Sequence, residues 1–147
     1  MSETKSATKK LTLWQKIMAV QLGLKPMTKN KPGFNYKYFD VNQQLEQLKL
    51  LLKEYGLIVI QPLSNIEGKP ALKLIVISGD EKYEDIMPLP VNSTKSRKLD
   101  KNGQPTDTIE EDPQKMGSSI TYFRRYQLQS FFLMESEDDD AKSAVNR

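Results

Sequence analysis

Two arginines stand side by side in a segment that otherwise has the pattern of a buried helix. Arg124 and Arg125 follow Tyr122 and Phe123 and precede Tyr126. Neighbouring residues of an α-helix point about 100° apart, because the helix turns once in 3.6 residues. The two guanidinium groups therefore cannot both enter one core face, and at least one must meet solvent, an acidic partner or a phosphate. Any fold of this chain has to keep one side of this helix at its surface.

This arginine pair, flanked by aromatic residues, allows two interpretations. Phosphates accept paired hydrogen bonds from guanidinium groups, and bases stack on aromatic rings, so the segment suits a nucleic acid. Alternatively, it is an ordinary amphipathic helix whose arginines form ion pairs with nearby acids. Taken by itself, the segment favours the second interpretation.

The composition removes most catalytic chemistry. The 147 residues include no cysteine and no histidine, which excludes disulfides, thiolate chemistry, Ser-His and Cys-His nucleophiles and His-zinc sites. The chain also lacks a Gly-x-x-x-x-Gly-Lys-Ser/Thr phosphate loop, since Gly68-Lys69-Pro70 has the wrong spacing. We therefore expect a protein that is not an enzyme and that uses no cofactor and no metal.

Charge is distributed unevenly along the chain. The formal net charge is +3, but residues 1–37 carry +7 and residues 135–147 carry −3. A basic arm and an acidic tail on one small protein indicate a polyanionic partner. No apolar run approaches the roughly 20 residues of a membrane span, and the absence of cysteine suits a reducing compartment. The expected location is the cytoplasm, without a membrane partner.

The apolar spacing predicts an α+β fold. Amphipathic helices are expected at residues 11–24, 41–55 and 113–134. Strand-like runs separated by turn residues lie at 57–63, 71–78 and 83–89. The predicted architecture is a small antiparallel three-stranded sheet packed by helices, in the order α-α-β-β-β-α. We expect one domain over residues 11–134, between disordered ends at residues 1–10 and 135–147.

Several residues are expected to begin helices or fill the core. Thr12 or Thr8 is a candidate cap for the first helix, Asp40 for the second, and Asp112 for the third, with Pro113 at its first position. The leucines of the second helix and the run from residue 57 to residue 60 are assigned to the core.

The polar segment of residues 92–112 is predicted to be a loop. It is too long for a simple connection, so it is either functional or mobile. Its cations are Lys95, Arg97, Lys98 and Lys101. Alone they would be a solvated loop, whereas beside the arginine helix they would form one wall of a nucleic-acid groove.

A second aromatic and basic patch is Tyr36-Lys37-Tyr38-Phe39. Its rings and its lysine would suit stacking and phosphate contact with a nucleic-acid strand. The alternative is that Tyr38 and Phe39 pack against the start of the following helix.

The acidic run from Glu135 to Asp140 has the ligand type of a Mg²⁺ site. Consecutive acids at a helix end point in different directions, however, and a two-metal nuclease needs carboxylates from separate rigid elements. A solvated charge run is the favoured interpretation.

Residues 117–126, followed by an apolar stretch and Glu137-Asp138-Asp139-Asp140, resemble the signature of the ERF family of bacteriophage single-strand annealing recombinases. The resemblance covers roughly residues 34–140. It also includes Tyr36-Lys37-Tyr38 before a helix and Gly56-Leu57 before a strand with Gln61-Pro62. The chain departs from the family at Phe123 and Gln127, where a small residue is common, and at Ala141, where Gly is frequent.

The resemblance implies ATP-independent binding of single-stranded DNA and annealing of complementary strands in phage homologous recombination. It further implies a β-β-β-α core, homo-oligomeric rings or filaments in the host cytoplasm, and a phage exonuclease or single-stranded DNA-binding protein as a further partner. The alternatives are a single-stranded DNA-binding protein without annealing activity and a Mg²⁺-dependent nuclease. The candidate DNA-binding residues are Arg124, Arg125, Tyr122, Lys115, Tyr36, Lys37, Lys95, Arg97, Lys98 and Lys101.

Overall fold

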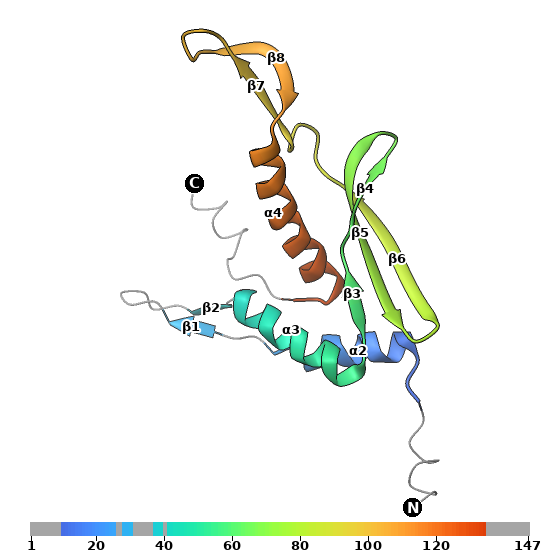
Figure 1. Ribbon diagram of the computed structural model, residues 1–147. Helices are drawn as coiled ribbons and strands as arrows, with labels where there is room; N and C mark the ends of the chain where they lie inside the picture. Colours follow the sequence, from blue (N-terminus) through green and yellow to red (C-terminus); the bar gives the residue numbers. More distant parts are fainter. Residues whose placement is uncertain (1–9, 26–27, 31–36, 40, 135–147) are drawn as a thin grey trace, which may run out of the picture. The chain divides into compact units, whose positions relative to one another are not determined.

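The computed structural model describes residues 10–25, 28–30, 37–39 and 41–134. They fall into two compact units. The first takes its described residues from 1–59, Val76–Tyr83 and 129–147, and the second consists of Ile60–Ile75 and Glu84–Leu128. The described helices are α2 (Leu13–Gly23), α3 (Val41–Tyr55) and α4 (Pro113–Phe131) (Figure 1). Helices and antiparallel strands in this order confirm the predicted α+β class.

The described strands form one larger sheet and two hairpins. Strands β3 (Ile58–Ile60), β4 (Leu63–Ile66) and β6 (Glu81–Pro88) all pair with β5 (Lys69–Ser78). The other pairs are β1 (Thr28–Asn30) with β2 (Lys37–Phe39), and β7 (Lys95–Leu99) with β8 (Pro105–Glu111).

The larger sheet thus has one strand more than predicted. The expected strand over residues 57–63 is divided into β3 and β4, with Gln61 and Pro62 between them. Proline has no backbone N–H for the strand ladder, which explains the interruption.

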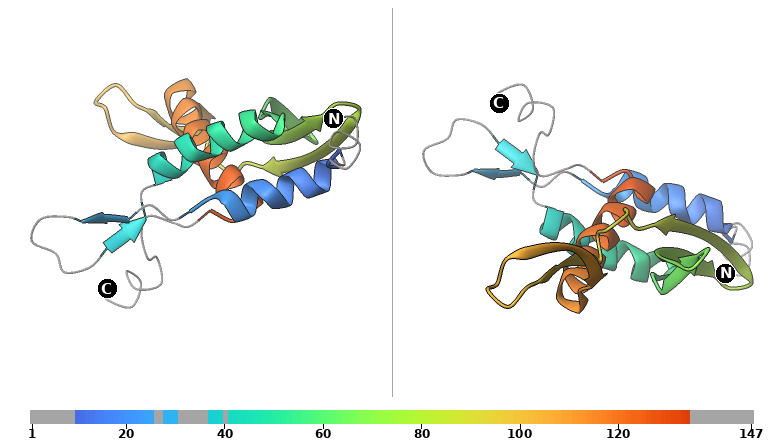
Figure 2. Two further views of the ribbon diagram at one scale, coloured as in Figure 1. Left: turned by 90° about the horizontal axis from the view of Figure 1, so that it is seen from below. Right: turned by 90° about the horizontal axis from the view of Figure 1, so that it is seen from above.

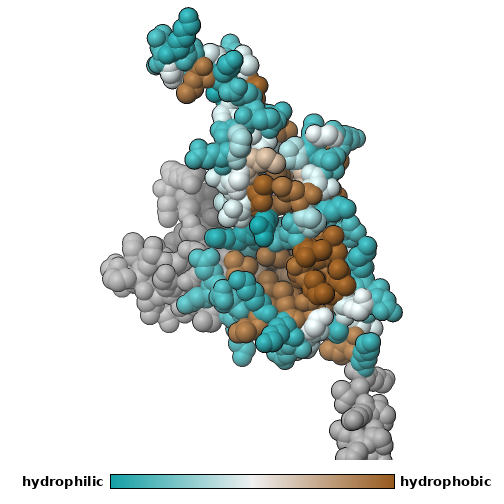
Figure 3. Space-filling view, viewed as in Figure 1, coloured by the Kyte–Doolittle hydropathy of each residue, from teal (hydrophilic) through white to brown (hydrophobic). Residues whose placement is uncertain are grey.

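The predicted loop over residues 92–112 is wrong for most of its length, because β7 and β8 form an antiparallel hairpin. Lys95 pairs with Glu111 and Arg97 with Ile109, and the register shifts between Arg97 and Leu99. In the turn, Gly103 has φ +80°, which is a left-handed conformation that glycine adopts without strain. Figure 3 shows that the hairpin surface is mainly hydrophilic.

The ends of the first two helices follow local sequence signals. Thr12 caps α2, because its hydroxyl accepts a hydrogen bond from the Gln15 amide while the Gln15 side chain accepts one from the Thr12 amide. Helix α3 ends before Gly56, which has φ +69°. Asp40, the predicted cap of α3, lies outside the described residues.

The first unit has its core between α2, α3 and the turn end of β5. Helices α2 and α3 run side by side (Figure 2), and Gly23 allows this, since an added Cβ would lie 3.1 Å from Leu51 Cδ2. Leu13, Val20 and Phe132 are fully buried. The predicted core residues Ile58 and Ile60, by contrast, are 57% and 45% exposed, so the core assignment of this run holds only for its first residue, Leu57, which is buried.

Candidate nucleic-acid interface

Helix α4 begins at a cap built from the hairpin and the helix together. Asp112 Oδ1 accepts hydrogen bonds from the amides of Gln114 and Lys115, both at 3.1 Å, and Oδ2 accepts one from the Ser96 hydroxyl. Pro113 is the first helical residue. The predicted cap and helix start are therefore confirmed.

The same contacts perturb the titration of the cap. The hydrogen bond from Ser96 and the backbone hydrogen bonds from Lys115 and Gln114 favour the carboxylate form, and they hold the pKa of Asp112 below its ordinary value of 3.8.

This lowered pKa predicts an acid-sensitive step in stability. The pKa is lower in the folded than in the unfolded chain, so the carboxylate stabilises the fold fully above pH 3.8. That stabilisation is lost as the pH falls through the lower folded pKa. Urea unfolding measured from about pH 5 to pH 2 should show a shallower fall of the unfolding free energy for Asp112→Asn than for the wild type. Ser96→Ala should move the loss of unfolding free energy caused by protonation of Asp112 to higher pH, because the carboxylate then lacks the hydrogen bond from Ser96. Equal slopes in all three proteins would contradict this role of the cap.

The exposed surface of α4 carries cations and no acid. Residues Pro113–Phe131 include Lys115, Arg124 and Arg125 and no acid, and all three cationic residues are exposed. The sequence required at least one arginine to leave the core, and both do. Within the described part of the chain, neither guanidinium group forms an ion pair. The interpretation of an amphipathic helix with arginines paired to nearby acids therefore finds no support there.

Two exposed tyrosines lie beside Arg125. Tyr122 and Tyr126 are 55% and 42% exposed, and their hydroxyl oxygens are 2.9 Å apart. Their rings meet edge to face, with centroids 4.6 Å apart, and Phe123 packs edge to face on Tyr122 at 5.1 Å. Positions three and four apart share one helix face, so Tyr122, Arg125 and Tyr126 form one aromatic and cationic surface.

Two glutamines fix this helix on the sheet. Gln127 is buried, and its Nε2 donates to the Leu72 carbonyl of β5 at 3.1 Å. Gln61 Nε2 donates to Gln127 Oε1 and to the Arg124 carbonyl, both at 2.9 Å. Sequence reasoning missed these roles. The available signals were a polar residue on the inner side of the helix and the polar residue before the strand-breaking Pro62.

The structure brings only part of the predicted cationic set together. Lys115 Nζ donates to the Lys95 carbonyl at 2.7 Å, so these two lysines are neighbours. Arg97 and Lys98 are exposed on β7, but adjacent strand positions point to opposite faces. Lys101 is exposed in the hairpin turn. No described contact joins these three residues to the arginines of α4.

The hairpin cations are also accompanied by acids. Strand β7 carries three cations and no acid, whereas β8 carries three acids and no cation. Lys95 Nζ lies 3.8 Å from the Glu111 carboxylate. The hairpin strands together are therefore neutral, and the acid-free cationic surface of this unit is that of α4.

Two of the predicted residues cannot be placed. Tyr36 lies outside the described residues, and Lys37 is described only as a member of strand β2. The acidic run of residues 135–140 lies outside them as well. Among the residues that the structure describes, no group of three or more Asp, Glu, His or Cys side chains is arranged to hold a metal ion. No helix within the described ranges has the length and apolar character needed to cross a membrane.

The comparisons with known proteins identify the family. The family model described as the ERF superfamily matches residues 13–147, which includes all of α4 and most of the chain. Comparisons with curated proteins and with solved structures found no match. The chain therefore belongs to the ERF superfamily, which gives it a general role in single-strand annealing or recombination.

Proposed function

We propose that this protein binds single-stranded DNA on the exposed surface of α4 and anneals complementary strands without ATP. One observation supports this above all others. Helix α4 carries three exposed cations, two exposed tyrosines and no acid. Cationic surfaces attract the phosphate backbone, and tyrosine rings stack on bases of any sequence.

The geometry suits the demands of annealing. Two complementary strands repel each other through their phosphates, and they pair only if their base edges remain accessible. Contacts from Lys115, Arg124 and Arg125 to phosphates would reduce that repulsion. Stacking on Tyr122 or Tyr126 uses the face of a base and leaves its pairing edge free. None of these roles needs a catalytic group, a metal or a nucleotide cofactor.

The size of the site favours an assembly of several copies. Helix α4 has 19 residues, which corresponds to about 28 Å of helix. One copy therefore covers only a few nucleotides, and a continuous DNA path requires a homo-oligomer, either a ring or a filament. We propose that it acts in the cytoplasm of a phage-infected host, with a phage exonuclease or a single-stranded DNA-binding protein as a further partner.

An annealing assay tests this function directly. Two complementary oligonucleotides carrying a donor and an acceptor dye are mixed with the purified protein, without ATP and without divalent metal. Pairing should be about tenfold faster or more than for the free strands, because the phosphate repulsion is neutralised. Tight binding of either strand without faster pairing would instead establish a single-stranded DNA-binding protein that does not anneal. Shortening of the strands on addition of Mg²⁺ would establish the nuclease alternative.

A further inference from the structure

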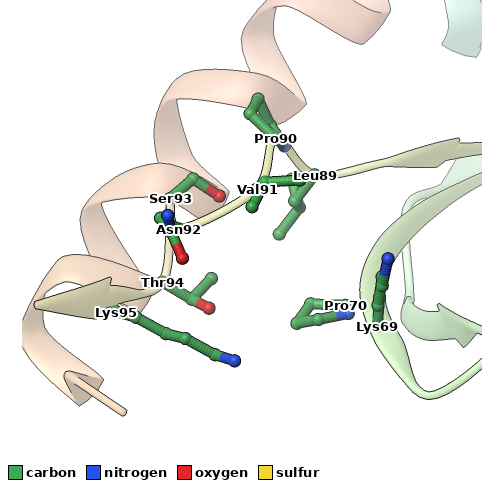
Figure 4. A pocket seen from close by; sticks show the side chains of 9 residues that line it. All are labelled: Lys69, Pro70, Leu89, Pro90, Val91, Asn92, Ser93, Thr94 and Lys95. Carbon is green, nitrogen blue, oxygen red and sulfur yellow. The ribbon is translucent and has the colours of Figure 1, made fainter. Parts of the chain in front are cut away.

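The second unit contains a small pocket beside the hairpin. It has a volume of about 90 Å³ and lies between Lys69-Pro70 at the start of β5 and the segment of residues 89–95 that leads from β6 into β7 (Figure 4). The Leu89 amide donates to the Pro70 carbonyl at 3.1 Å and so holds the two segments together. The following turn is closed by a hydrogen bond from the Ser93 amide to the Pro90 carbonyl at 3.0 Å.

The walls of the pocket are mainly apolar. Pro70, Leu89 and Pro90 contribute rings and a buried aliphatic side chain, and the Thr94 side chain extends into the space between the two segments (Figure 4). Val91 is 80% exposed at the rim. Mainly apolar walls that include the hydroxyl residues Ser93 and Thr94 resemble the surroundings that proteins give to an unstacked base, which is held between apolar side chains and hydrogen-bonded at its edge.

The mouth of the pocket is cationic. Lys69 and Lys95 flank it from its two segments (Figure 4). The only described acid paired with either lysine is Glu111, at 3.8 Å from Lys95 Nζ, and both side chains of that pair are strongly exposed. Such a pair is weak and exchanges readily for another anion. The Lys95 carbonyl accepts the hydrogen bond from Lys115 Nζ, so the pocket adjoins the start of α4.

We propose that this pocket takes the edge of one base of the bound single strand, with the neighbouring phosphates on Lys69 and Lys95. The inference rests on the proposed function, because α4 would deliver the strand to the pocket. The pocket volume of about 90 Å³ is below the roughly 150 Å³ of a cavity that holds benzene. It therefore admits only the edge of a base and not a whole ring.

This site would have a distinct part in annealing. A base whose edge is inside the pocket is not available for pairing, so each copy would hold one base and present the others. The held base must leave the pocket when the complementary strand pairs with it. The pocket therefore favours single strands over duplex and sets the position of the strand on each copy.

Photocross-linking of a thymine oligomer carrying 4-thiothymine tests the pocket on the full-length protein. The cross-linked peptide is identified by mass spectrometry. We expect adducts at Lys69 or within residues 89–95. An oligomer that binds but cross-links only elsewhere would overturn the pocket and leave the proposed function intact. Failure of any oligomer to bind would instead contradict the proposed function itself.

Matched variants test whether DNA binding depends on the pocket itself or only on the overall charge of the protein. Val91→Glu should weaken binding of a thymine oligomer roughly tenfold, the loss expected for one stacked base. Leu50→Glu makes a comparable change at a residue of α3 that is 70% exposed and should leave binding of this oligomer unchanged. Lys69→Gln should make the salt dependence shallower by about 0.7 in log Kd per log salt, whereas Lys53→Gln on α3 should affect it little. Equal effects within each pair would overturn the assignment.

Discussion

Replacing both arginines of α4 by alanine is expected to weaken binding of single-stranded DNA by about 30- to 100-fold at low salt. Two lost phosphate contacts together correspond to roughly 2–3 kcal/mol. The slope of log Kd against log salt should become shallower by about 1.4, or 0.7 for each contact. Fluorescence anisotropy with a labelled oligonucleotide over a range of salt concentrations measures both quantities. The fold should persist, because Arg124 and Arg125 are exposed.

A second double variant tests whether DNA binding depends on the positions of the two arginines or only on the net charge of the protein. Lys49 and Lys53 are exposed on α3, and replacing both by alanine removes the same two charges. This variant should bind DNA nearly as tightly as the wild type. Equal losses in the two double variants would mean that only the net charge matters. Unchanged affinity of the arginine variant together with easier unfolding would mean that the pair is structural.

The substitution Gln127→Leu is expected to lower the free energy of unfolding by about 1–3 kcal/mol, although leucine has a similar size and is apolar. Gln127 is buried and bonds both to the Leu72 carbonyl and to Gln61. Leucine removes both hydrogen bonds and leaves the partly buried end of the Gln61 side chain with one partner fewer, and the loss of buried polar contacts carries a cost of this size. Urea unfolding followed by circular dichroism provides the measurement.

The same substitution at an exposed position of α4 is the control. Gln114→Leu should change the stability by no more than about 0.5 kcal/mol, as is usual at a surface site. In native buffer Gln127→Leu should still bind DNA, since the charges of the helix are retained. If the two leucine variants were equally stable, the glutamine contacts would not be what fixes α4 on β5.

The sequence predicts the helices well because their signals are local. A capping residue, an apolar period of 3.6 and a glycine stop are properties of neighbouring residues, and Thr12, Gly56 and Asp112 show them plainly. The side of the helix that is buried is harder to predict. In α2, Leu13 and Ile17 are buried whereas Trp14 and Met18 are more than half exposed, and a purely local apolar pattern does not distinguish these pairs.

The hairpin β7–β8 was missed for a physical reason. A strand is recognised by alternation of apolar and polar residues, which arises only when one face is buried. Nearly all residues of β7 and β8 are exposed or half-buried polar ones, so this alternation is absent. The usable signal was the turn, because Asn-Gly is a common hairpin connection. In the structure Asp100 Oδ1 accepts hydrogen bonds from the amides of Asn102 and Gln104, both at 2.9 Å.

The charged residues of the candidate site could be predicted from the sequence, whereas the contacts that hold them in place could not. Adjacent arginines on a helix had to include an exposed one, and that conclusion needed only helix geometry. The link between Gln61 and Gln127 joins residues 66 positions apart, and the pocket joins Lys69 to a segment some twenty residues later. Contacts of this kind depend on how the strands pair, which no local pattern specifies.

The opposite charges of β7 and β8 have one more consequence. Three positive side chains on one strand and three negative ones on its neighbour give the hairpin a transverse electric dipole. A neutral dipole in the field of a polyanion experiences a torque, but little net attraction. The hairpin would therefore affect the orientation of the protein on the DNA more than its affinity. It would turn its β7 side toward an approaching DNA strand and its β8 side away from it.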